Sequence, residues 1–202
     1  MTGIDAMVHA IEAMTSRIKK NALSDMLGRE ALKTLGGNIR KATGEDSKNA
    51  KVRENMLLGS MYAGMAFANA PVGAVHALAY PLGTLFHVPH GLSISIVLPA
   101  VLRFNAKRSD LARKVYAEAA DIIFPSEASR TTSEKEKSEI LASGFVHLAS
   151  SLGLQTKLKD VGVGENDIAR MAEDAMKQTR LLPNNPADVH KDDCFNLYRE
   201  VL

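Results

Sequence analysis

Asp5 and His9 lie four residues apart in a segment whose apolar residues recur at helical spacing. Side chains at this spacing share one face of a helix, one turn apart. A carboxylate and an imidazole placed in this way can bind one metal ion together. The spacing alone is weak evidence, because most such pairs are surface polar residues or hydrogen-bonded couples. A metal role therefore needs ligands from elsewhere in the chain.

Two more histidines lie in or beside the least polar part of the chain. His76 occurs in the stretch GAVHALAY, and His90 lies between Pro89 and Gly91 at an expected helix start. An imidazole is costly to bury unless its ring nitrogens find partners. Taken singly, His76 is interpreted as a core histidine and His90 as a residue of an N-terminal turn. His87 is either a cleft residue or a partly exposed histidine.

The three histidines and the aspartate together predict a metal site. Imidazole and carboxylate ligands suit Fe²⁺, Zn²⁺, Mn²⁺ or Co²⁺. Three nitrogens and one oxygen leave a coordination position for water or a substrate oxygen, as in catalytic sites. Cys194 is the only cysteine, which excludes a disulfide within the chain and a thiolate cluster.

The bulk composition is that of an ordinary globular protein. Hydrophobic residues make up 46% of the 202 residues and charged residues 24%, and the net charge is +2. So small a charge gives no electrostatic case for a nucleic-acid partner. No apolar run is long enough to span a membrane, and the first twenty residues lack a signal-peptide layout. We therefore expect a cytoplasmic protein with neither nucleic acid nor membrane as a partner.

Helical periodicity dominates the sequence, and the strand signal is weak, with aromatic residues at only 5% and no tryptophan. The periodicity predicts helices over residues 4–20, 24–35, 49–70, 106–121 and 139–153, one after a cap near residue 165 or 166, and a last one after residues 190–192. The second half of the 49–70 helix is apolar all round, so we expect it at the domain centre. Residues 126–138 are polar and predict a surface loop or a solvated helix start.

Proline and glycine recur between residues 71 and 105, which predicts short helices broken at these residues. Within this region, residues 93–98 are interpreted as a buried helix that opens after residues 89–91. The whole pattern indicates an all-α fold, with a single domain of seven to nine helices over residues 1–202.

Three stretches resemble the signature sequences of the iron-containing (group III) alcohol dehydrogenases: TGIDAMVHAIEA, GMAFANAPVGAVHALAYPLG and FHVPHGLS. The tail, with GLQTKLKDVGV, resembles the C-terminal helical domain of that family. The resemblance covers essentially the whole chain, and the spacing of its motifs is highly specific. It implies a multi-helix domain of the dehydroquinate synthase-like α-domain type.

The resemblance also implies roles for individual residues. Asp5, His9, His76 and His90 match the four metal ligands of the family. Many members carry a histidine near the nicotinamide at the position of Tyr80, so the tyrosine hydroxyl either replaces it in proton transfer or only packs.

Phe67, in the stretch GMAF, matches a position that lines the substrate side of the cleft. The other interpretation of Phe67 is a core aromatic residue on a buried helix.

The implied activity is the interconversion of a small alcohol with an aldehyde or ketone, using NAD(P) and a bound Fe²⁺ or Zn²⁺. Family members bind NAD(P) in an α/β domain with a glycine-rich loop, and no such loop occurs here. The sequence therefore predicts the metal-binding half alone, without cofactor-binding residues and with little or no activity by itself. An exposed apolar face where the nucleotide domain docks would favour a homodimer. Two alternatives are a metal-dependent hydrolase module and a structural helical domain without metal.

Overall fold

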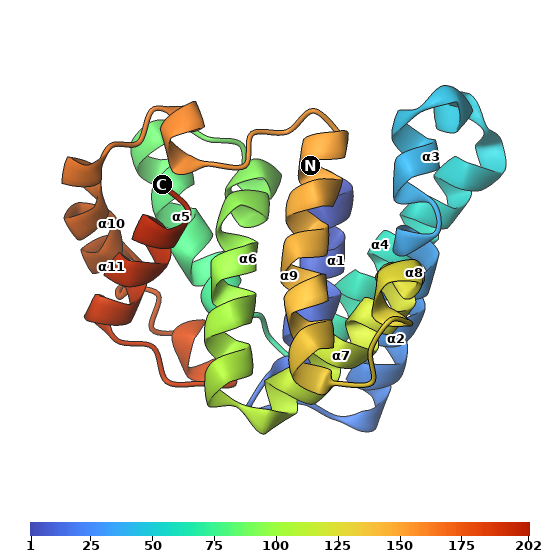
Figure 1. The fold of residues 1–202 in the computed structure, drawn as a ribbon, viewed down its shortest axis with the longest axis horizontal. Coiled ribbons are helices and arrows are strands. Elements are labelled where there is room, and N and C mark those ends of the chain that lie inside the picture. Colours follow the sequence, from blue (N-terminus) through green and yellow to red (C-terminus); the bar gives the residue numbers. More distant parts are fainter.

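The computed structural model describes all 202 residues, and every regular element in it is a helix (Figure 1). This confirms the all-α prediction. The α-helices are α1 (Thr2–Thr15), α2 (Ala22–Gly36), α3 (Ile39–Thr43), α4 (Ala50–Asn69), α5 (Ala74–Phe86), α6 (His90–Arg108), α7 (Asp110–Ile123), α8 (Pro125–Ala128), α9 (Glu134–Ser151), α10 (Ile168–Ala175) and α11 (Lys191–Glu200). Short 3₁₀ helices cover Glu45–Lys48, Leu158–Val161, Glu165–Asp167 and Leu182–Asn184.

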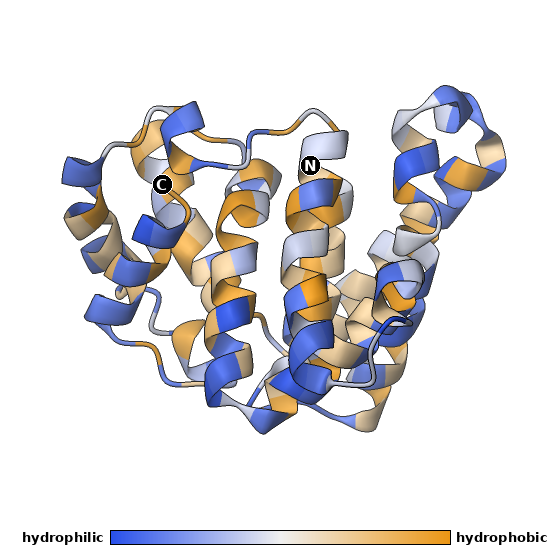
Figure 2. Ribbon diagram, viewed as in Figure 1, coloured by the Kyte–Doolittle hydropathy of each residue, from blue (hydrophilic) through white to orange (hydrophobic).

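Helix α1 lies at the centre of the fold, in contact with α2, α4, α6 and α7. Its apolar side chains are almost completely buried, among them Ile4, Met7, Ile11 and Met14. In Figure 1 it runs behind α9, with α10 and α11 on one side and α2 to α4 on the other. The outer helices α10 and α11 carry many hydrophilic residues (Figure 2). Because α1 is enclosed by other helices, several of its polar residues lie in the interior, where they need partners.

The first helix ends earlier than predicted, at Thr15 and not at Lys20. Ser16 adopts an extended conformation, and the Arg17 N–H donates to the carbonyl of Asn184 at 2.7 Å. Tertiary hydrogen bonding therefore ends the helix although the apolar periodicity continues. The second helix starts at a capping box in which the side chain of Asn21 accepts from the Ser24 N–H.

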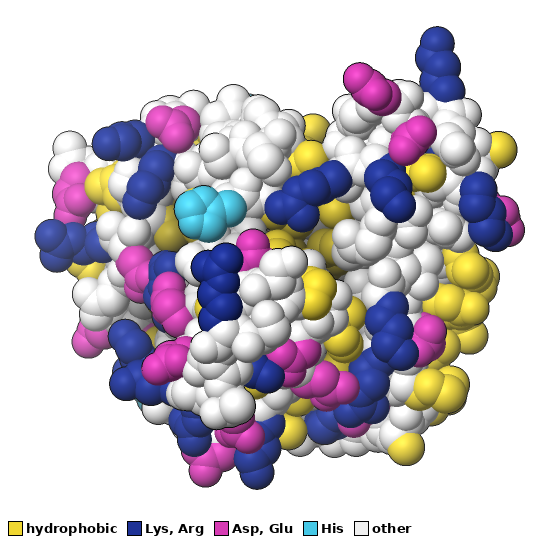
Figure 3. Space-filling view, turned by 45° about the vertical axis from the view of Figure 1, so that its right-hand side comes forward, with side chains coloured by type: hydrophobic (Ala, Val, Ile, Leu, Met, Phe, Trp, Pro, Cys, Tyr) yellow, Lys and Arg dark blue, Asp and Glu magenta, His cyan; other side chains and the backbone are white.

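The prediction of a central third helix was wrong. Only four residues of α4 are buried, and Leu57, Met61 and Met65 are 75%, 51% and 46% exposed. Helix α4 packs on α1 and α2 with its small residues and turns its larger apolar residues outward. Hydrophobic side chains gather along the right-hand edge of the molecule in Figure 3, the side on which α2 and α4 lie. Composition gave the apolar character of this helix correctly, but not which face is covered.

The prediction of short, broken helices between residues 71 and 105 was also wrong. Helices α5 and α6 run through Pro81 and Pro99 without a break. A proline inside a helix removes one hydrogen bond and costs about 3 kcal/mol. Both prolines are buried in a densely packed region. The Tyr198 hydroxyl donates to the Leu78 carbonyl, in the turn before Pro81, at 2.7 Å. Core packing offsets the cost.

The remaining boundaries differ by a few residues. Helix α6 extends to Arg108, so α7 starts at Asp110 and not at residue 106. Helix α9 starts at Glu134, with Ser133 as its N-cap, which confirms a solvated helix start within residues 126–138. Nine of the eleven α-helices have eight or more residues, which agrees with the predicted seven to nine; the sequence missed the short α3 and α8. None of the helices is both long and apolar enough to cross a bilayer.

The close approach of α4 to α2 generates a stability prediction. A Cβ added at Gly59 would lie 2.7 Å from Cγ of the fully buried Leu35, whereas one added at Gly64 would meet no atom within 4 Å. Gly59→Ala should therefore lower the free energy of unfolding by about 1–3 kcal/mol. Gly64→Ala, on the same helix, should raise it by up to about 1 kcal/mol through helix propensity. Urea denaturation measures both, and equal effects of the two changes would contradict this packing.

Candidate metal centre

The four residues predicted as ligands lie together, although they come from three helices. Asp5 and His9 lie on α1, His76 lies in the first turn of α5, and His90 is the first residue of α6. The carboxylate oxygen Oδ1 of Asp5 lies 3.4 Å from Nδ1 of His9, 3.6 Å from Nε2 of His76 and 3.9 Å from Nε2 of His90. The three imidazoles therefore surround a single carboxylate oxygen.

The four side chains of the cluster differ in their exposure to solvent, from buried to partly exposed. The His76 side chain is only 4% exposed, those of Asp5 and His9 are 18% and 21% exposed, and that of His90 is 45% exposed. One ligand atom each from Asp5, His9 and His76 lies within 4.8 Å of the other two. The cluster is therefore closed to solvent at His76 and accessible to solvent at His90, which we call its open side. That is the form of a site which binds an ion deeply and still admits a small molecule.

Two buried atoms of the cluster have no hydrogen-bond partner: Oδ1 of Asp5 and Nε2 of His76. Leaving such groups unpaired costs about 1–3 kcal/mol each, and more where a charge is involved. Both atoms face the same space, and a divalent cation there would satisfy both. The residues present therefore fit a metal ion of the type that nitrogen and oxygen ligands bind.

The second nitrogen of His9 has a defined partner. Its Nδ1 lies 2.9 Å from the backbone carbonyl of Asp5, to which it can only donate. We assign the proton to Nδ1 on this contact, so Nε2 of His9 carries the lone pair. An imidazole oriented by a hydrogen bond at its other nitrogen is the usual form of a histidine that binds metal.

Charges within the cluster shift three pKa values. Burial alone would raise the pKa of Asp5, but the nearby His76 ring and the charges of the histidines lower it. Burial and the charge of His76 lower the pKa of His9. Burial would also lower the pKa of His76, but the charge of Glu12, the nearby Asp5 carboxylate and the hydrogen bond with Glu12 raise it to about 9. Without a metal ion at neutral pH, the raised pKa of His76 favours the cationic ring, with a proton on both nitrogens.

Glu12 is a residue of this region that the sequence analysis missed. It lies on α1, is only 6% exposed, and accepts from the Val75 N–H at 2.8 Å and from Nδ1 of His76 at 2.5 Å. A signal was present, since Asp5, His9 and Glu12 follow one another at spacings of four and three on one helix face. Glu12 was not singled out because its partners lie more than sixty residues away.

The three remaining predicted residues take different places. The Phe67 ring lies 4.7 Å from that of His9 and is 39% exposed, so it borders the cluster and is not a core aromatic. The Tyr80 ring lies 5.9 Å from that of His90 and is 41% exposed, beside the open side. His87 is an exposed C-cap residue of α5 with φ of 56° and makes no hydrogen bond or ion pair with the cluster.

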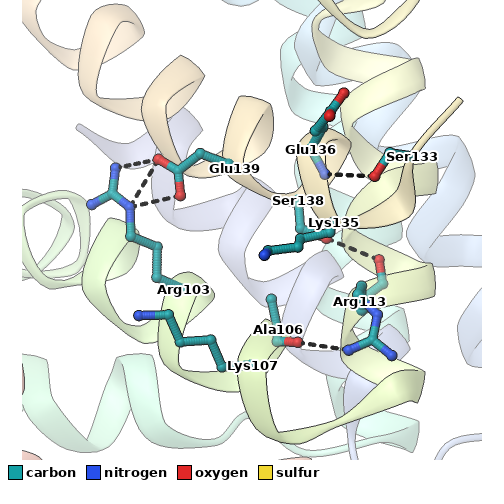
Figure 4. Close-up of a pocket in the computed structure, with 9 residues that line it drawn as sticks. All are labelled: Arg103, Ala106, Lys107, Arg113, Ser133, Lys135, Glu136, Ser138 and Glu139. Atoms are coloured by element: carbon teal, nitrogen blue, oxygen red, sulfur yellow. Dashed lines mark hydrogen bonds and ion pairs between the residues drawn. The ribbon is translucent and has the colours of Figure 1, made fainter. Parts of the chain in front are cut away.

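A cavity of about 220 Å³ adjoins Asp5 and His9, between α1 and α4. Thr2, Ala6, Ser60, Ala63, Gly64 and Phe67 complete its lining. A larger cavity of about 520 Å³ lies between α6, α7 and α9 and contains none of the clustered residues (Figure 4). There Arg103 is paired with Glu139, and Arg113 donates to the Ala106 carbonyl. These contacts brace the helices.

Comparison with known proteins identifies the family. The model of the "Fe-containing alcohol dehydrogenase family, C-terminal" matches residues 1–202. The chain belongs to this family. It is 34% identical over 201 residues to 1,3-propanediol dehydrogenase of Citrobacter freundii, covering 100% of this chain and 50% of that protein. It is 34% identical to lactaldehyde reductase of Escherichia coli, covering 98% and 49% of the two chains.

Solved structures agree with this assignment. The alcohol dehydrogenase from Oenococcus oeni superposes with a TM-score of 0.91 at 31% identity, covering 100% of this chain and 50% of that one. The chain thus spans about half the length of its relatives in the iron-containing alcohol dehydrogenase family. The predicted family and the helical C-terminal domain fold are both confirmed.

The charge state of His76 generates a pH prediction for the metal-free protein. Its pKa rises from 6.5 to about 9 on folding, so its contribution is fully present below pH 6.5 and is lost as the pH rises through 9. The free energy of unfolding should therefore fall by about 3 kcal/mol across this window, at about 1.4 kcal/mol per pKa unit. Urea denaturation in the presence of a chelator, repeated at several pH values, measures the fall.

Two variants control for other titrating groups. His76→Gln should remove most of the fall, because the residue that loses the proton is gone. His87→Asn should retain it, because His87 lies outside the cluster. A wild-type stability that stays constant between pH 6.5 and 9 would contradict the charge distribution described here.

Proposed function

We propose that this chain is the metal-binding catalytic half of an NAD(P)-dependent alcohol dehydrogenase, which interconverts an alcohol with an aldehyde or ketone. The observation that carries the proposal is the convergence of three histidines on the unpartnered Oδ1 of Asp5. Membership of the iron-containing alcohol dehydrogenase family supports it. So do the names of two relatives, a 1,3-propanediol dehydrogenase and a lactaldehyde reductase.

Asp5, His9, His76 and His90 would hold one Fe²⁺ or Zn²⁺ ion. When bound, such a cation supplies a Lewis acid that polarises the oxygen of an alcohol or carbonyl substrate. The Asp5 carboxylate offsets one of its two positive charges, and three neutral imidazoles leave the remainder. Zn²⁺ binds nitrogen and oxygen ligands more tightly than Fe²⁺ does, so affinity alone does not select Fe²⁺. The ion recovered with the protein therefore depends on which of the two is available to it.

The residues around the cluster define how a substrate would be held. Phe67 presents a half-exposed ring beside His9, and the adjoining cavity of about 220 Å³ is of a size for a small alcohol or aldehyde. The Tyr80 hydroxyl, on the open side beside His90, would exchange a proton between the substrate oxygen and solvent.

The cofactor would be bound outside residues 1–202. These residues form no strand and therefore no α/β unit of the kind that binds a dinucleotide. Hydride transfer needs the nicotinamide next to the carbinol carbon, so the open side at His90 and Tyr80 would face the cofactor half. By itself, this chain would bind metal and show little or no dehydrogenase activity.

Metal analysis tests the proposal without a substrate. The purified chain, loaded with Fe²⁺ or Zn²⁺ and then desalted, should retain about one ion per chain. His76→Ala removes the most deeply buried ligand and should lose most of this metal. His147→Ala, which changes an exposed histidine of α9 outside the cluster, should retain it. A wild-type chain without bound metal would contradict the proposal and favour a purely structural helical domain.

A further inference from the structure

Glu12 is a buried carboxylate beside the four proposed ligands, and the bound ion itself would not touch it. Each of its oxygens has one partner: Oε1 accepts from the Val75 N–H and Oε2 from Nδ1 of His76. We propose that Glu12 is a positioning residue that fixes the ring orientation and tautomer of His76. It thereby directs the Nε2 lone pair toward Asp5. This inference rests on the proposed metal site.

The tautomer follows from the chemistry of the pair. An ionised carboxylate can only accept hydrogen bonds, so the ring nitrogen that faces Glu12 must carry a proton. In the neutral ring the lone pair then lies on Nε2, which is 3.6 Å from Oδ1 of Asp5 and has no other partner. Metal ligands of this kind commonly donate their second ring N–H to a carboxylate, which also raises their basicity.

The hydrogen bond with the Val75 N–H gives Glu12 a second role, at the start of helix α5. Helix α5 begins after Gly73 without a side-chain cap, and a Cβ at Gly73 would lie 3.1 Å from the Asn185 backbone. A serine or aspartate cap there would require the Asn185 backbone to shift. Glu12 replaces it from α1, since its carboxylate satisfies a free N–H in the first turn of α5. One side chain thus caps α5 and orients the ligand in that turn.

The placement of Glu12 links the two groups that would share the ion. Asp5 and Glu12 lie seven residues apart on one face of α1, and His76 lies between their carboxylates. Glu12 therefore fixes the first turn of α5 to α1 beside the site.

Replacement by glutamine separates this positioning role from a merely structural one. In Glu12→Gln the amide oxygen can still accept from the Val75 N–H, so the link between the helices is retained. The amide NH₂ then faces Nδ1 of His76 and can only donate. The proton of the neutral ring must move to Nε2, and the lone pair that would bind the metal is lost.

Cobalt titration is the first measurement. Co²⁺ reports its coordination by visible absorption, and wild-type chain should bind one ion. Glu12→Gln should weaken the binding roughly 10- to 100-fold, the usual effect of removing such a partner. At a pH where the His76 ring is neutral, the metal-free melting temperature of this variant should stay close to that of wild type. Unchanged Co²⁺ affinity in Glu12→Gln would overturn the proposal.

Tyr198→Phe is the matched control. The Tyr198 hydroxyl also ties α5 to another helix, through the Leu78 carbonyl, but it touches no ligand. Its loss should lower the melting temperature and leave the Co²⁺ affinity within about twofold, because a change in protein stability does not by itself alter a preformed site. If Tyr198→Phe weakened Co²⁺ binding as much as Glu12→Gln, Glu12 would be a structural tether only.

Nitrogen-15 NMR of the histidines in metal-free protein, at a pH where the His76 ring is neutral, separates this inference from the proposed function. Wild type should carry the proton on Nδ1 of His76, and Glu12→Gln should carry it on Nε2. A wild-type proton on Nε2 would overturn the positioning role. A wild-type proton on Nδ1 in a chain that binds no Co²⁺ would support the role of Glu12 and contradict the metal site.

Discussion

Two carboxylates of one buried helix hold His76 between them, and the geometry of the site depends on this arrangement. Glu12 binds Nδ1 of His76, and Asp5 lies 3.6 Å from Nε2. Most of helix α1 is buried, which leaves the Glu12 side chain 7% and the Asp5 side chain 18% exposed. Charges that cannot be solvated must be paired or bound to a cation. The packing of α1 in the core therefore makes these polar side chains pair with one another and form a site.

The graded exposure of the cluster follows from which helix supplies each residue. α1 and the first turn of α5 lie within the core, so Asp5, His9 and His76 are held rigidly. His90 begins α6 at the surface and leaves one side open, with Tyr80 next to it. Three enclosed side chains with one accessible side would suit the proposed metal site, which a substrate must be able to reach.

Much of this could be predicted from sequence because it depends on local pattern. The spacing of Asp5 and His9 and the motifs around His76 and His90 selected four residues that the structure places together. The all-α fold followed from helical periodicity. The tertiary consequences did not follow: the length of α1 is set by a contact with Asn184, and α5 continues through Pro81 within a densely packed core. Glu12 was missed for the same reason, since its partners come from a distant helix.

Asp5, His9, His76 and His90 are proposed to bind one divalent ion. Anomalous diffraction from crystals of the Zn²⁺-loaded chain tests this proposal most directly. A single peak is expected about 2.0–2.2 Å from Oδ1 of Asp5 and from Nε2 of the three histidines. Glu12 should remain on Nδ1 of His76, outside the coordination sphere. A peak bound by Glu12, a peak elsewhere in the molecule, or no peak at all would contradict it.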